Sequence, residues 1–406
     1  MGEAHYRILV IGGGSGGVSL AARLVNLGFK GQVGLIEPSE THDYQPLWTL
    51  AGVGLVPKER TRRPSEGLMP RGVTWIKDAV TGFLPQSNMV TTAHHGPVTY
   101  EVLVVATGLE LNYEKIAGLE GHLGRDGLFS VYRYDQVDYA AQAIQSFKGG
   151  TAIFTMPPVP IKCAGAPQKV MYLADHIWRR SGVRDKARIV FASAGATIFG
   201  VKEFAAELNK VIARKGIETM FQHKLAEVDA GRKVATFEVP EASSEGVKVV
   251  RREIGYDILH VVPPMSAPKV VRESELASEE EGQKGWLAVD KFTLQHKRFA
   301  NVFGIGDVTG VPNSKTGAAI RKQAPVVALN ICDFIAGRPL THKYDGYSSC
   351  PLITDIGKVM LAEFGYDGVL MPSFPLDPTK ERRLYWHLKK DLLPPMYWYG
   401  MLKGLV

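Results

Sequence analysis

Two cysteines of this 406-residue chain lie among residues that favour turns rather than a packed core. Cys163 stands in PPVPIKCAGAPQK, residues 157–169, among prolines, glycine and lysines. Cys350 follows small polar residues in YDGYSSCPLIT and precedes Pro351. The thiolate is the reactive form of cysteine, and neighbouring lysines favour it. This setting predicts a reactive thiol at Cys163 and a second thiol in a similar turn at Cys350.

Two lysines could support chemistry at these thiols. Lys169 follows Cys163 by six residues, so its charge could hold a thiolate or a polysulfide. Lys315 comes directly before the helix predicted from Thr316, whose positive dipole end would help it stabilise a reduced, negatively charged cofactor. The alternative for both lysines is a solvated side chain. The remaining cysteine, Cys332, lies on the apolar helical pattern VVALNICDFI and is predicted to be structural.

The amino-terminal segment predicts an element that would bind such a cofactor. The apolar run RILVI, residues 7–11, leads into GGGSGG and then into a helical pattern. Gly12, Gly14 and Gly17 match G-x-G-x-x-G, which permits a tight turn, close approach to a pyrophosphate and close packing of helix on strand. Glu37 ends a second apolar run twenty residues after Gly17, where its carboxylate can accept both ribose hydroxyls. Together these features predict a dinucleotide site.

Two later strands indicate that the dinucleotide is FAD. YEVLVVATG ends in Thr107 and Gly108, and NVFGIGDV carries Gly306 and Asp307 near its end. Both runs resemble FAD signatures of the two-dinucleotide-binding disulfide reductase flavoproteins, which implies that Asp307 takes a ribitol hydroxyl. The alternative for Asp307 is an ordinary helix N-cap. Residues 44–48 after the ribose-binding strand are expected near the flavin, with core packing as an equal alternative.

A second glycine fingerprint, which an NAD(P)H-dependent enzyme of this class would need, is missing from the middle of the chain. The strand predicted at residues 187–193 runs into AGATIFG, residues 194–200, which lacks G-x-G-x-x-G. Its β-branched and aromatic residues would obstruct a pyrophosphate. We therefore expect a nucleotide-like domain without a nicotinamide site. Electrons must then come from elsewhere, and two turn-borne cysteines beside a flavin suggest a redox-active disulfide.

Motifs spread over nearly the whole chain, from Tyr6 to the tail, resemble those of one family. They are IKCAGAPQK, IFGVK at 198–202, YDILHVVPPMS at 256–266, VFGIGD, NSKTGAA at 313–319 and YDGYSSCPL. Together they are similar to the sulfide:quinone oxidoreductases, in the branch that includes the mitochondrial enzymes. The resemblance implies that Cys163 and Cys350 form the redox pair. Many bacterial relatives use a third cysteine, in some cases attached to FAD, and because this sequence has no match for it we expect noncovalent FAD.

The resemblance also implies a function. Sulfide would be oxidised to sulfane sulfur, as persulfide or polysulfide, and two electrons would pass through FAD to a membrane quinone. Cys163 is expected to face the flavin. The sulfur would leave on a small acceptor, which is a thiol, sulfite or a growing polysulfide. The sequence allows a homo-oligomer.

Three other functions stay open. An NADH:quinone oxidoreductase would need the missing central fingerprint. A flavocytochrome-type sulfide dehydrogenase would pass electrons to a haem subunit, yet the chain has no C-x-x-C-H motif and, as written, reaches its first strand by residue 7 without room for an export signal. A non-enzymatic FAD-binding partner protein would be favoured only if the cysteines were unreactive.

These signatures predict an α/β fold with two Rossmann-like nucleotide-binding domains. The predicted FAD domain is discontinuous and comprises residues 1–116 and 270–343. A degenerate nucleotide-like domain with Cys163 is predicted at residues 117–269, and a C-terminal segment with Cys350 at residues 344–406. A polar stretch at 241–253 is expected to form a hairpin or loop. Cys163 and Cys350 can meet only if the middle domain and the last segment both close over the flavin.

The charge of the chain and its tail indicate a membrane partner. The net charge is +7, the basic residues are scattered, and no nucleic-acid motif occurs, so an anionic membrane surface and the anion HS⁻ explain the excess. No apolar run reaches about 20 residues. Residues 380–406 interleave Trp, Tyr and Leu with Lys and Arg, which is typical of an amphipathic segment lying on a bilayer, divided into two pieces by Pro394 and Pro395. The alternative is that the aromatic residues pack on the core or on a dimer partner.

The expected location is peripheral to a membrane. It is the cytoplasmic face of a bacterial inner membrane or, if the chain is a processed form, the mitochondrial inner membrane. His42, His176, His260 and His296 lack metal-ligand spacing, so no metal site is predicted. Three cysteines also exclude a scaffold stapled by disulfides.

Overall fold

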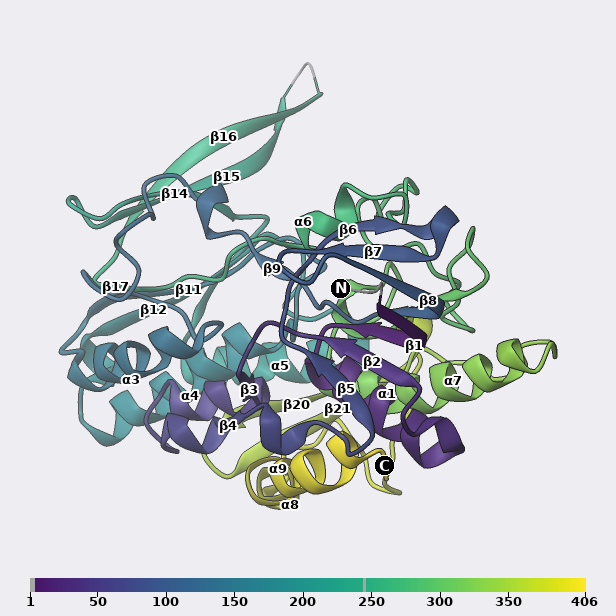
Figure 1. Cartoon of the computed structure of the whole chain (residues 1–406). Helices are drawn as coiled ribbons and strands as arrows, with labels where there is room; N and C mark the ends of the chain where they lie inside the picture. The colour runs from purple at the N-terminus through teal and green to yellow at the C-terminus, as the bar shows by residue number, and fades with distance from the viewer. Residues whose placement is uncertain (1–3, 244–245) are drawn as a thin grey trace.

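The structure is a computed structural model in which residues 4–243 and 246–406 are described. Figure 1 shows two regions of sheet side by side with helices around them, a long hairpin projecting from one region, and the C-terminal helices along the opposite edge. The predicted α/β fold with two Rossmann-like domains is confirmed. Within the described residues, no helix combines the length and apolar character needed to cross a membrane.

The first sheet is built mainly from the amino-terminal part of the chain. Parallel strands β5, β2, β1, β8 and β19 lie in this order, and the hairpin of β6 and β7 pairs with the start of β8. Their bounds are β1 Ala4–Ile11, β2 Val33–Ile36, β5 Val73–Ile76, β6 Val80–Leu84, β7 Met89–Thr92, β8 Pro97–Val105 and β19 Val302–Gly304. The apolar end of β8 is fully buried, as in a parallel sheet covered on both faces. Val302 of β19 pairs with Leu103, so the chain returns to this sheet after building the second one.

Helices α1, Ser15–Leu24, and α7, Gly317–Ile335, pack against each other beside this sheet. Helix α7 begins where it was predicted, because Thr316 Oγ1 accepts a 3.2 Å hydrogen bond from the Ala319 amide and caps the helix. The shorter elements of this region are β3 Thr41–Asp43, α2 Trp48–Ala51, β4 Arg62–Pro64, β9 Glu110–Leu111, β18 Met265–Ser266 and α6 Lys269–Arg272.

The second sheet is parallel throughout, with the order β10, β17, β11, β12, β13. Its strands and accompanying helices are β10 Leu128–Phe129, α3 Val137–Ser146, β11 Gly150–Met156, α4 Ala166–Arg180, β12 Ala187–Ser193, α5 Lys202–Lys215, β13 Glu218–Phe221 and β17 Ile258–His260. A separate antiparallel sheet joins β14 Lys224–Asp229, β15 Val234–Ser243 and β16 Gly246–Gly255. The polar stretch 241–253 belongs to the projecting β15–β16 hairpin, which confirms the hairpin prediction, although its residues 244–245 lie outside the described part of the chain.

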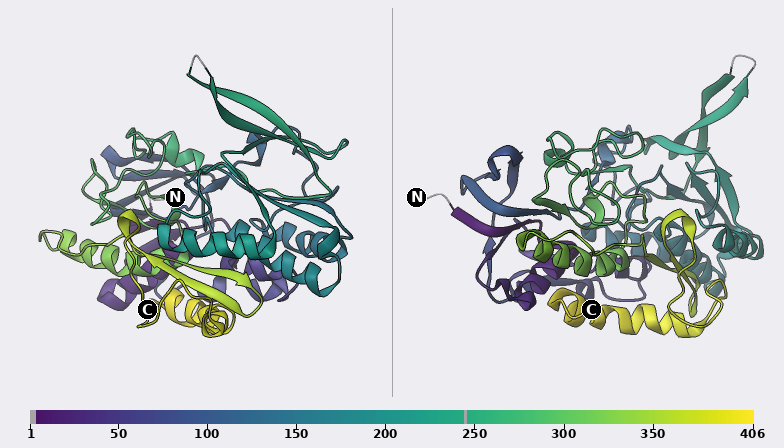
Figure 2. Two further views of the ribbon diagram at one scale, coloured as in Figure 1. Left: turned by 180° about the vertical axis from the view of Figure 1, so that it is seen from behind. Right: turned by 90° about the vertical axis from the view of Figure 1, so that its right-hand side faces the viewer.

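The C-terminal segment forms an antiparallel hairpin followed by a helical stretch. Strands β20, Ser348–Asp355, and β21, Lys358–Phe364, make the hairpin, and β20 packs on α4. Helices α8 Arg383–His387 and α9 Leu393–Pro395 alternate with π-helical turns at Leu388–Leu392 and Met396–Gly400. Figure 2 shows this stretch running on along one side of the molecule.

The expected division of the tail at Pro394 and Pro395 is therefore wrong. Each proline lacks an amide donor, but π-helical turns bridge the gap by hydrogen bonds that reach back five residues, from Leu393 to Leu388 and from Met401 to Met396. The helical stretch consequently continues through both prolines. The predicted domain boundaries themselves stay a proposal.

Candidate active site

A cavity of about 640 Å³ brings together parts of the chain that are far apart in sequence. Its wall is formed by the first glycine turn, the Cys163 loop, the start of α7, the β20–β21 hairpin and the C-terminal helices. The predicted site residues that line it are Gly12, Gly14, Glu37, Thr107, Gly108, Cys163, Lys169, Gly306, Asp307 and Lys315. Gly17 and Cys350 do not line the cavity.

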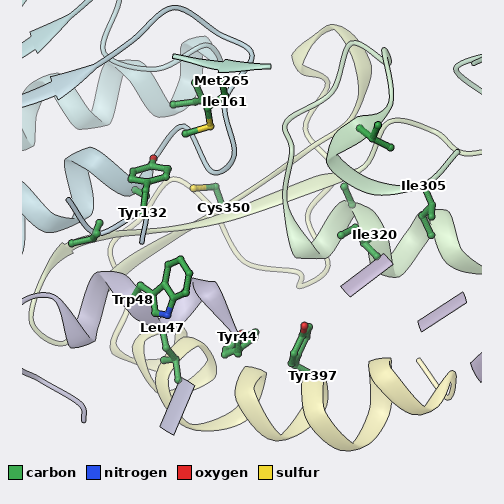
Figure 3. Close-up of a cluster of buried hydrophobic side chains, with 14 of the residues drawn as sticks. Tyr44, Leu47, Trp48, Tyr132, Ile161, Met265, Ile305, Ile320, Cys350 and Tyr397 are labelled. Atoms are coloured by element: carbon green, nitrogen blue, oxygen red, sulfur yellow. The ribbon is translucent and has the colours of Figure 1, made fainter. Parts of the chain in front are cut away.

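Aromatic and apolar side chains from several segments surround this space. Figure 3 shows four of the ring side chains, Tyr44, Trp48, Tyr132 and Tyr397, which come from three segments of the chain. The rings of Tyr44 and Tyr397 lie 4.5 Å apart, centroid to centroid. Residues 44–46 and Trp48 line the cavity, whereas Leu47 packs in the core. Of the two alternatives for residues 44–48, a place at the cofactor cavity thus applies to four residues and core packing to Leu47.

The turn between β1 and α1 has the geometry of a phosphate-binding loop. Gly12 adopts φ +103°, and a Cβ atom there would lie 2.5 Å from the Ala106 carbonyl oxygen. A Cβ on Gly17 would lie 1.8 Å from the Gly12 oxygen, so helix and turn touch at this point. Gly14 instead faces the cavity, and a Cβ there would meet no atom within 4 Å. The backbone is thus exposed to a ligand where a pyrophosphate would sit.

Polar groups around this turn fit the remainder of a dinucleotide. Glu37 Oε2 accepts a 2.6 Å hydrogen bond from the Gly13 amide and Oε1 a 2.7 Å bond from Ser39, which fixes the carboxylate at the cavity wall. Thr107 Oγ1 is buried and has no hydrogen-bond partner within the described residues. Burial raises the pKa of Asp307, whose side chain also lines the cavity. Buried polar groups are normally hydrogen-bonded, so the Thr107 hydroxyl and the Asp307 carboxyl group indicate that a polar ligand binds beside them.

Two buried lysines supply positive charge. Lys315 Nζ donates a 2.9 Å hydrogen bond to the Thr309 carbonyl and lies 3.9 Å from the centroid of the Trp286 ring. Burial lowers the pKa of Lys315 to about 8. Burial likewise lowers the pKa of Lys162 to about 8, and its Nζ donates a 2.8 Å bond to Gln45 Oε1. Both amines lie at the cavity and could stabilise negative charge in it.

The Cys163 loop is held from both sides. Its amide donates a 2.9 Å hydrogen bond to the Lys315 carbonyl, and its own carbonyl accepts bonds from Tyr132 Oη at 3.2 Å and the Ala166 amide at 2.8 Å. Cys163 has φ +49°, a left-handed conformation that non-glycine residues adopt at a cost and that is common at functional sites. The loop therefore presents the sulfur in a fixed position.

The structure brings Cys163, Cys350 and Lys169 together. Lys169 Nζ lies 3.3 Å from Cys163 Sγ. The Cys350 thiol donates a hydrogen bond to the Cys163 sulfur, and this bond, together with the Lys169 charge, holds the pKa of Cys163 well below its usual value. The same hydrogen bond and burial raise the pKa of Cys350. The surroundings therefore favour the thiolate form at Cys163 more than at Cys350.

Local sequence explains why Cys350 reaches its partner. Side chains alternate along β20, so Cys350 points to α4 while Ser349 and Pro351 on either side line the cavity. Gly165 leaves room for the thiol, because a Cβ there would lie 2.6 Å from Cys350 Sγ. Any larger residue at position 165 would push the two cysteines apart.

Sequence reasoning missed Lys389, which it placed in a membrane-binding tail. The side chain is buried at the cavity wall, and Nζ donates a 3.0 Å hydrogen bond to the Pro46 carbonyl. Burial, and then the charge of Lys169, lower the pKa of Lys389 to about 7. The sequence held no signal for this, because Lys389 stands beside Lys390 and an amphipathic pattern does not say which face packs on the protein.

The aromatic residues of the tail also differ from expectation. Tyr385, Trp386, Tyr397 and Trp398 are all buried in the core rather than presented to a bilayer, which is the alternative stated for them. Tyr397 Oη bonds Ser15 Oγ at 2.6 Å, on the first turn of α1. The tail is therefore part of the wall of the cofactor site, and these aromatics cannot serve as interfacial anchors.

Comparisons with known proteins identify the family. Residues 6–145 match the model of the pyridine nucleotide-disulphide oxidoreductases. The mitochondrial sulfide:quinone oxidoreductase of Dictyostelium discoideum is 44% identical over 98% of this chain and 86% of its own length, and that of Mus musculus is 42% identical over 98% and 87%. The chain belongs to the sulfide:quinone oxidoreductase family. The resemblance found in the sequence motifs is confirmed, and with it the flavin-dependent oxidoreductase class of the enzyme.

A solved structure agrees with this family in fold. The sulfide:quinone oxidoreductase of Aquifex aeolicus superimposes with a TM-score of 0.79 over 99% of this chain and 92% of its own, at 21% sequence identity. At that identity the likeness concerns the fold alone. It places the two nucleotide-binding domains of this sulfide:quinone oxidoreductase family member in a known arrangement.

The second nucleotide-binding turn of this family member is filled by its own side chains. Ile198 is buried, and its carbonyl accepts a 2.5 Å hydrogen bond from Gln168 Nε2. Phe199 packs against Phe204 of α5 and Phe364 of β21, with ring centroids 6.2 and 6.0 Å apart. The C-terminal hairpin thus contacts this turn, which supports the prediction that it holds no nicotinamide.

Proposed function

We propose that this protein oxidises sulfide to sulfane sulfur at the Cys163–Cys350 pair and passes the electron pair through noncovalent FAD to a membrane quinone. The observation that carries the proposal is the contact of the two thiols with each other and of Lys169 with Cys163, at the wall of a cavity that fits a flavin dinucleotide. Membership of the family supports it, since the relatives are named for this reaction.

The sulfur step uses the oxidised pair. HS⁻ forms a bond to one cysteine sulfur while the Cys163–Cys350 bond breaks, and the other sulfur leaves as a thiolate. An acceptor thiolate then takes the sulfane sulfur, so both cysteines are left reduced. Re-forming the disulfide releases the electron pair. With a thiol as acceptor, one H₂S, one RSH and one quinone give one RSSH and one quinol.

The charges of the site suit these roles. Lys169 lies beside Cys163 and stabilises the thiolate that each cycle releases. Cys163 lines the cavity and Cys350 does not, which supports Cys163 as the thiol that faces the flavin. Sulfide would then attack so that Cys163 becomes the leaving thiolate, because the thiol of lower pKa leaves faster.

FAD fits the residues that remain. The Gly12–Gly14 backbone would take the pyrophosphate, Glu37 the ribose hydroxyls, and Thr107 and Asp307 the polar groups of the flavin half. When bound, FAD would accept the electron pair at the thiol site and yield it to quinone. Lys315 would stabilise the negative charge of the reduced cofactor. Among the described residues, Cys163 is the one cysteine that lines this cavity, and Cys332 lies outside the lining, which supports noncovalent binding.

The outer face of the C-terminal helices supports membrane attachment. Leu384, Leu388, Leu392, Met396 and Tyr399, here called the outer stripe, recur every three to four residues. Leu384, Leu392 and Tyr399 are 57%, 60% and 62% exposed. Leu388 and Met396 also line the cavity, so the stripe and the cavity share a wall. A bilayer against this stripe would bring a lipid-soluble quinone to the site.

Vesicle binding tests the attachment. Replacing Leu384 and Leu392 with serine removes two exposed side chains that the bilayer would bury, at a cost of about 3 kcal/mol or more in total, so binding to anionic vesicles should fall roughly 10²-fold. Leu84→Ser with Val249→Ser, two exposed apolar residues elsewhere, is the matched control and should bind normally. Flavin reduction by sulfide should be unchanged in both. Normal vesicle binding of the stripe variant would remove the stripe from the proposal.

A further inference from the structure

The β20–β21 hairpin has two faces with different chemistry. Cys350 lies on the face that meets α4. On the opposite face, the paired residues Ser349 with Glu363 and Pro351 with Leu361 line the cavity. The proposed sulfur chemistry therefore involves only the face of the hairpin that carries Cys350. The residues of the opposite face, which line the cavity, take no part in it.

Glu363 is an unusual residue for that second face. Its side chain lines the cavity although the residue is only 3% exposed, and it forms no ion pair with any cation among the described residues. Buried carboxyl groups are normally paired with a cation, because desolvating a charge is costly. A buried, unpaired acid on a cavity wall is a candidate for proton transfer.

Hydrogen bonds fix the Glu363 carboxyl group. Oε1 accepts from Tyr347 Oη at 2.5 Å and from Ser373 Oγ at 2.6 Å, and Oε2 accepts from the Ser373 amide at 2.9 Å. Tyr347 is buried, and burial together with the bond to Glu363 raises its pKa. Ser373 is exposed, so it connects the carboxyl group to water.

The surroundings of Glu363 suit an apolar ring with polar oxygens. The apolar residues that the β20–β21 hairpin, the loop after it and the C-terminal helices contribute to the cavity wall are Pro351, Leu361, Phe374, Leu388, Leu393 and Met396. Phe374 and Met396 are partly exposed, and Met396 belongs to the outer stripe that would meet the bilayer. A quinone head group that enters from the lipid would meet Glu363 among these residues.

We infer that Glu363 donates one of the two protons that a quinone takes up on reduction, with Tyr347 and Ser373 as positioning residues. The inference rests on the proposed function. The quinone gains two electrons and two protons: the electron pair and one proton come from the reduced cofactor, and the second proton leaves the Glu363 carboxyl group for a quinone oxygen. Water at Ser373 then returns a proton to Glu363.

The groups that face Glu363 come from three segments. They are Tyr347 before β20, Ser373 after β21 and Tyr385 of α8. Behind Tyr347, the charged groups of Arg321 and Lys322 on α7 lie 5.9 and 5.5 Å from its ring centroid. A Glu363→Gln variant keeps the shape of the side chain and removes the acid.

Stopped-flow spectroscopy of the flavin-loaded enzyme separates proton delivery from electron transfer. The enzyme is reduced with dithionite and mixed with a short-chain ubiquinone analogue or with ferrocenium, which accepts an electron without a proton. In Glu363→Gln, reoxidation by the quinone should fall about 10²-fold, the scale of lost general-acid catalysis. Reoxidation by ferrocenium should match wild type. Added acetic acid should restore part of the quinone rate.

Controls keep the outcome interpretable. Glu381→Gln removes a carboxylate beside the same hairpin that lies outside the cavity and accepts hydrogen bonds from Arg214, and it should reoxidise normally with both acceptors. If Glu363→Gln does not fold, Tyr347→Phe tests the same network and should slow the quinone reaction alone. A quinone rate within threefold of wild type, or an equal loss with ferrocenium, would overturn the inference. Dithionite reduces the flavin independently of sulfide, so failure of the sulfide reaction would show separately.

Discussion

The two nucleotide-binding domains of this chain share a fold and differ at one turn. After β1, Gly12 and Gly14 leave the backbone open to the cavity, and Gly17 lets α1 approach. After β12, the corresponding turn is filled by Ile198 and Phe199, and Phe364 from β21 packs on it. The sheet alone does not make a cofactor site, because the side chains of one short turn decide whether a phosphate can approach.

In the second domain, the segment that follows a strand carries a thiol instead of a phosphate-binding turn. The segment after β11 leads to the Cys163 loop, and α4 behind it carries Lys169 and contacts β20. One domain therefore presents a cofactor turn to the cavity and the other presents a thiol. Under the proposed function, the dithiol takes the place that a nicotinamide would have as electron donor, without a change of fold.

The largest expected effect comes from closing the first turn. Gly17→Val should abolish FAD binding, because a Cβ at this position would lie 1.8 Å from the Gly12 oxygen and force helix and turn apart. The flavin absorbance of the purified protein measures it. The matched change in the second turn, Gly200→Ala, meets no atom within 4 Å and should keep full flavin content. A fully loaded Gly17→Val protein would contradict the assignment of the two turns.

Removal of one thiol should have the next largest effect. Cys350→Ser should keep FAD and slow flavin reduction by sulfide by about 10³-fold or more, since no disulfide is available for attack. Anaerobic stopped-flow measures the reduction rate. Cys332→Ser, on α7 and outside the cavity lining, is the control and should reduce at the normal rate. Rapid reduction of Cys350→Ser would remove the disulfide from the mechanism.

The filled second turn should exclude nicotinamides. NADH and NADPH should neither bind at micromolar concentration nor reduce the flavin, because Ile198 and Phe199 occupy the turn where a pyrophosphate would lie. Anaerobic mixing and calorimetry measure reduction and binding. Stoichiometric reduction by either nicotinamide would show that the second domain still works as a cofactor site and would favour an NADH:quinone oxidoreductase.

A smaller effect should follow the loss of charge beside Cys163. The hydrogen bond from Cys350 and the charge of Lys169 lower the pKa of Cys163, so Lys169→Met should raise that pKa and move formation of the thiolate to higher pH. The rate of alkylation of the reduced protein, followed against pH, measures the change. Its midpoint should move to higher pH while the rate at high pH stays the same. An unmoved midpoint would show that Lys169 does not hold the thiolate.

Sequence reasoning reached the parts of the site that depend on local patterns. The glycine turn, Glu37 and the start of α7 follow from spacing along short segments, and in the structure all three lie at the cavity wall. The cysteine pair was identified by family resemblance, because nothing in local pattern brings together residues 163 and 350. The structure then shows their contact.

The missed features depend on long-range packing. The helical stretch at 383–403 turns Trp386 and Lys389 inward and Leu392 outward, and an amphipathic pattern alone does not say which face meets protein. The role of Glu363 likewise depends on Tyr347 and Ser373, which reach it only when the hairpin and the following loop fold together. Charge and hydropathy gave no sign of either arrangement.

Anaerobic titration of the purified, FAD-loaded protein with sulfide tests the central claim most directly. The flavin absorbance should bleach stoichiometrically with sulfide in the absence of any nicotinamide, and adding a quinone should restore it. No bleaching with sulfide in a protein that holds FAD and both cysteines would contradict the account.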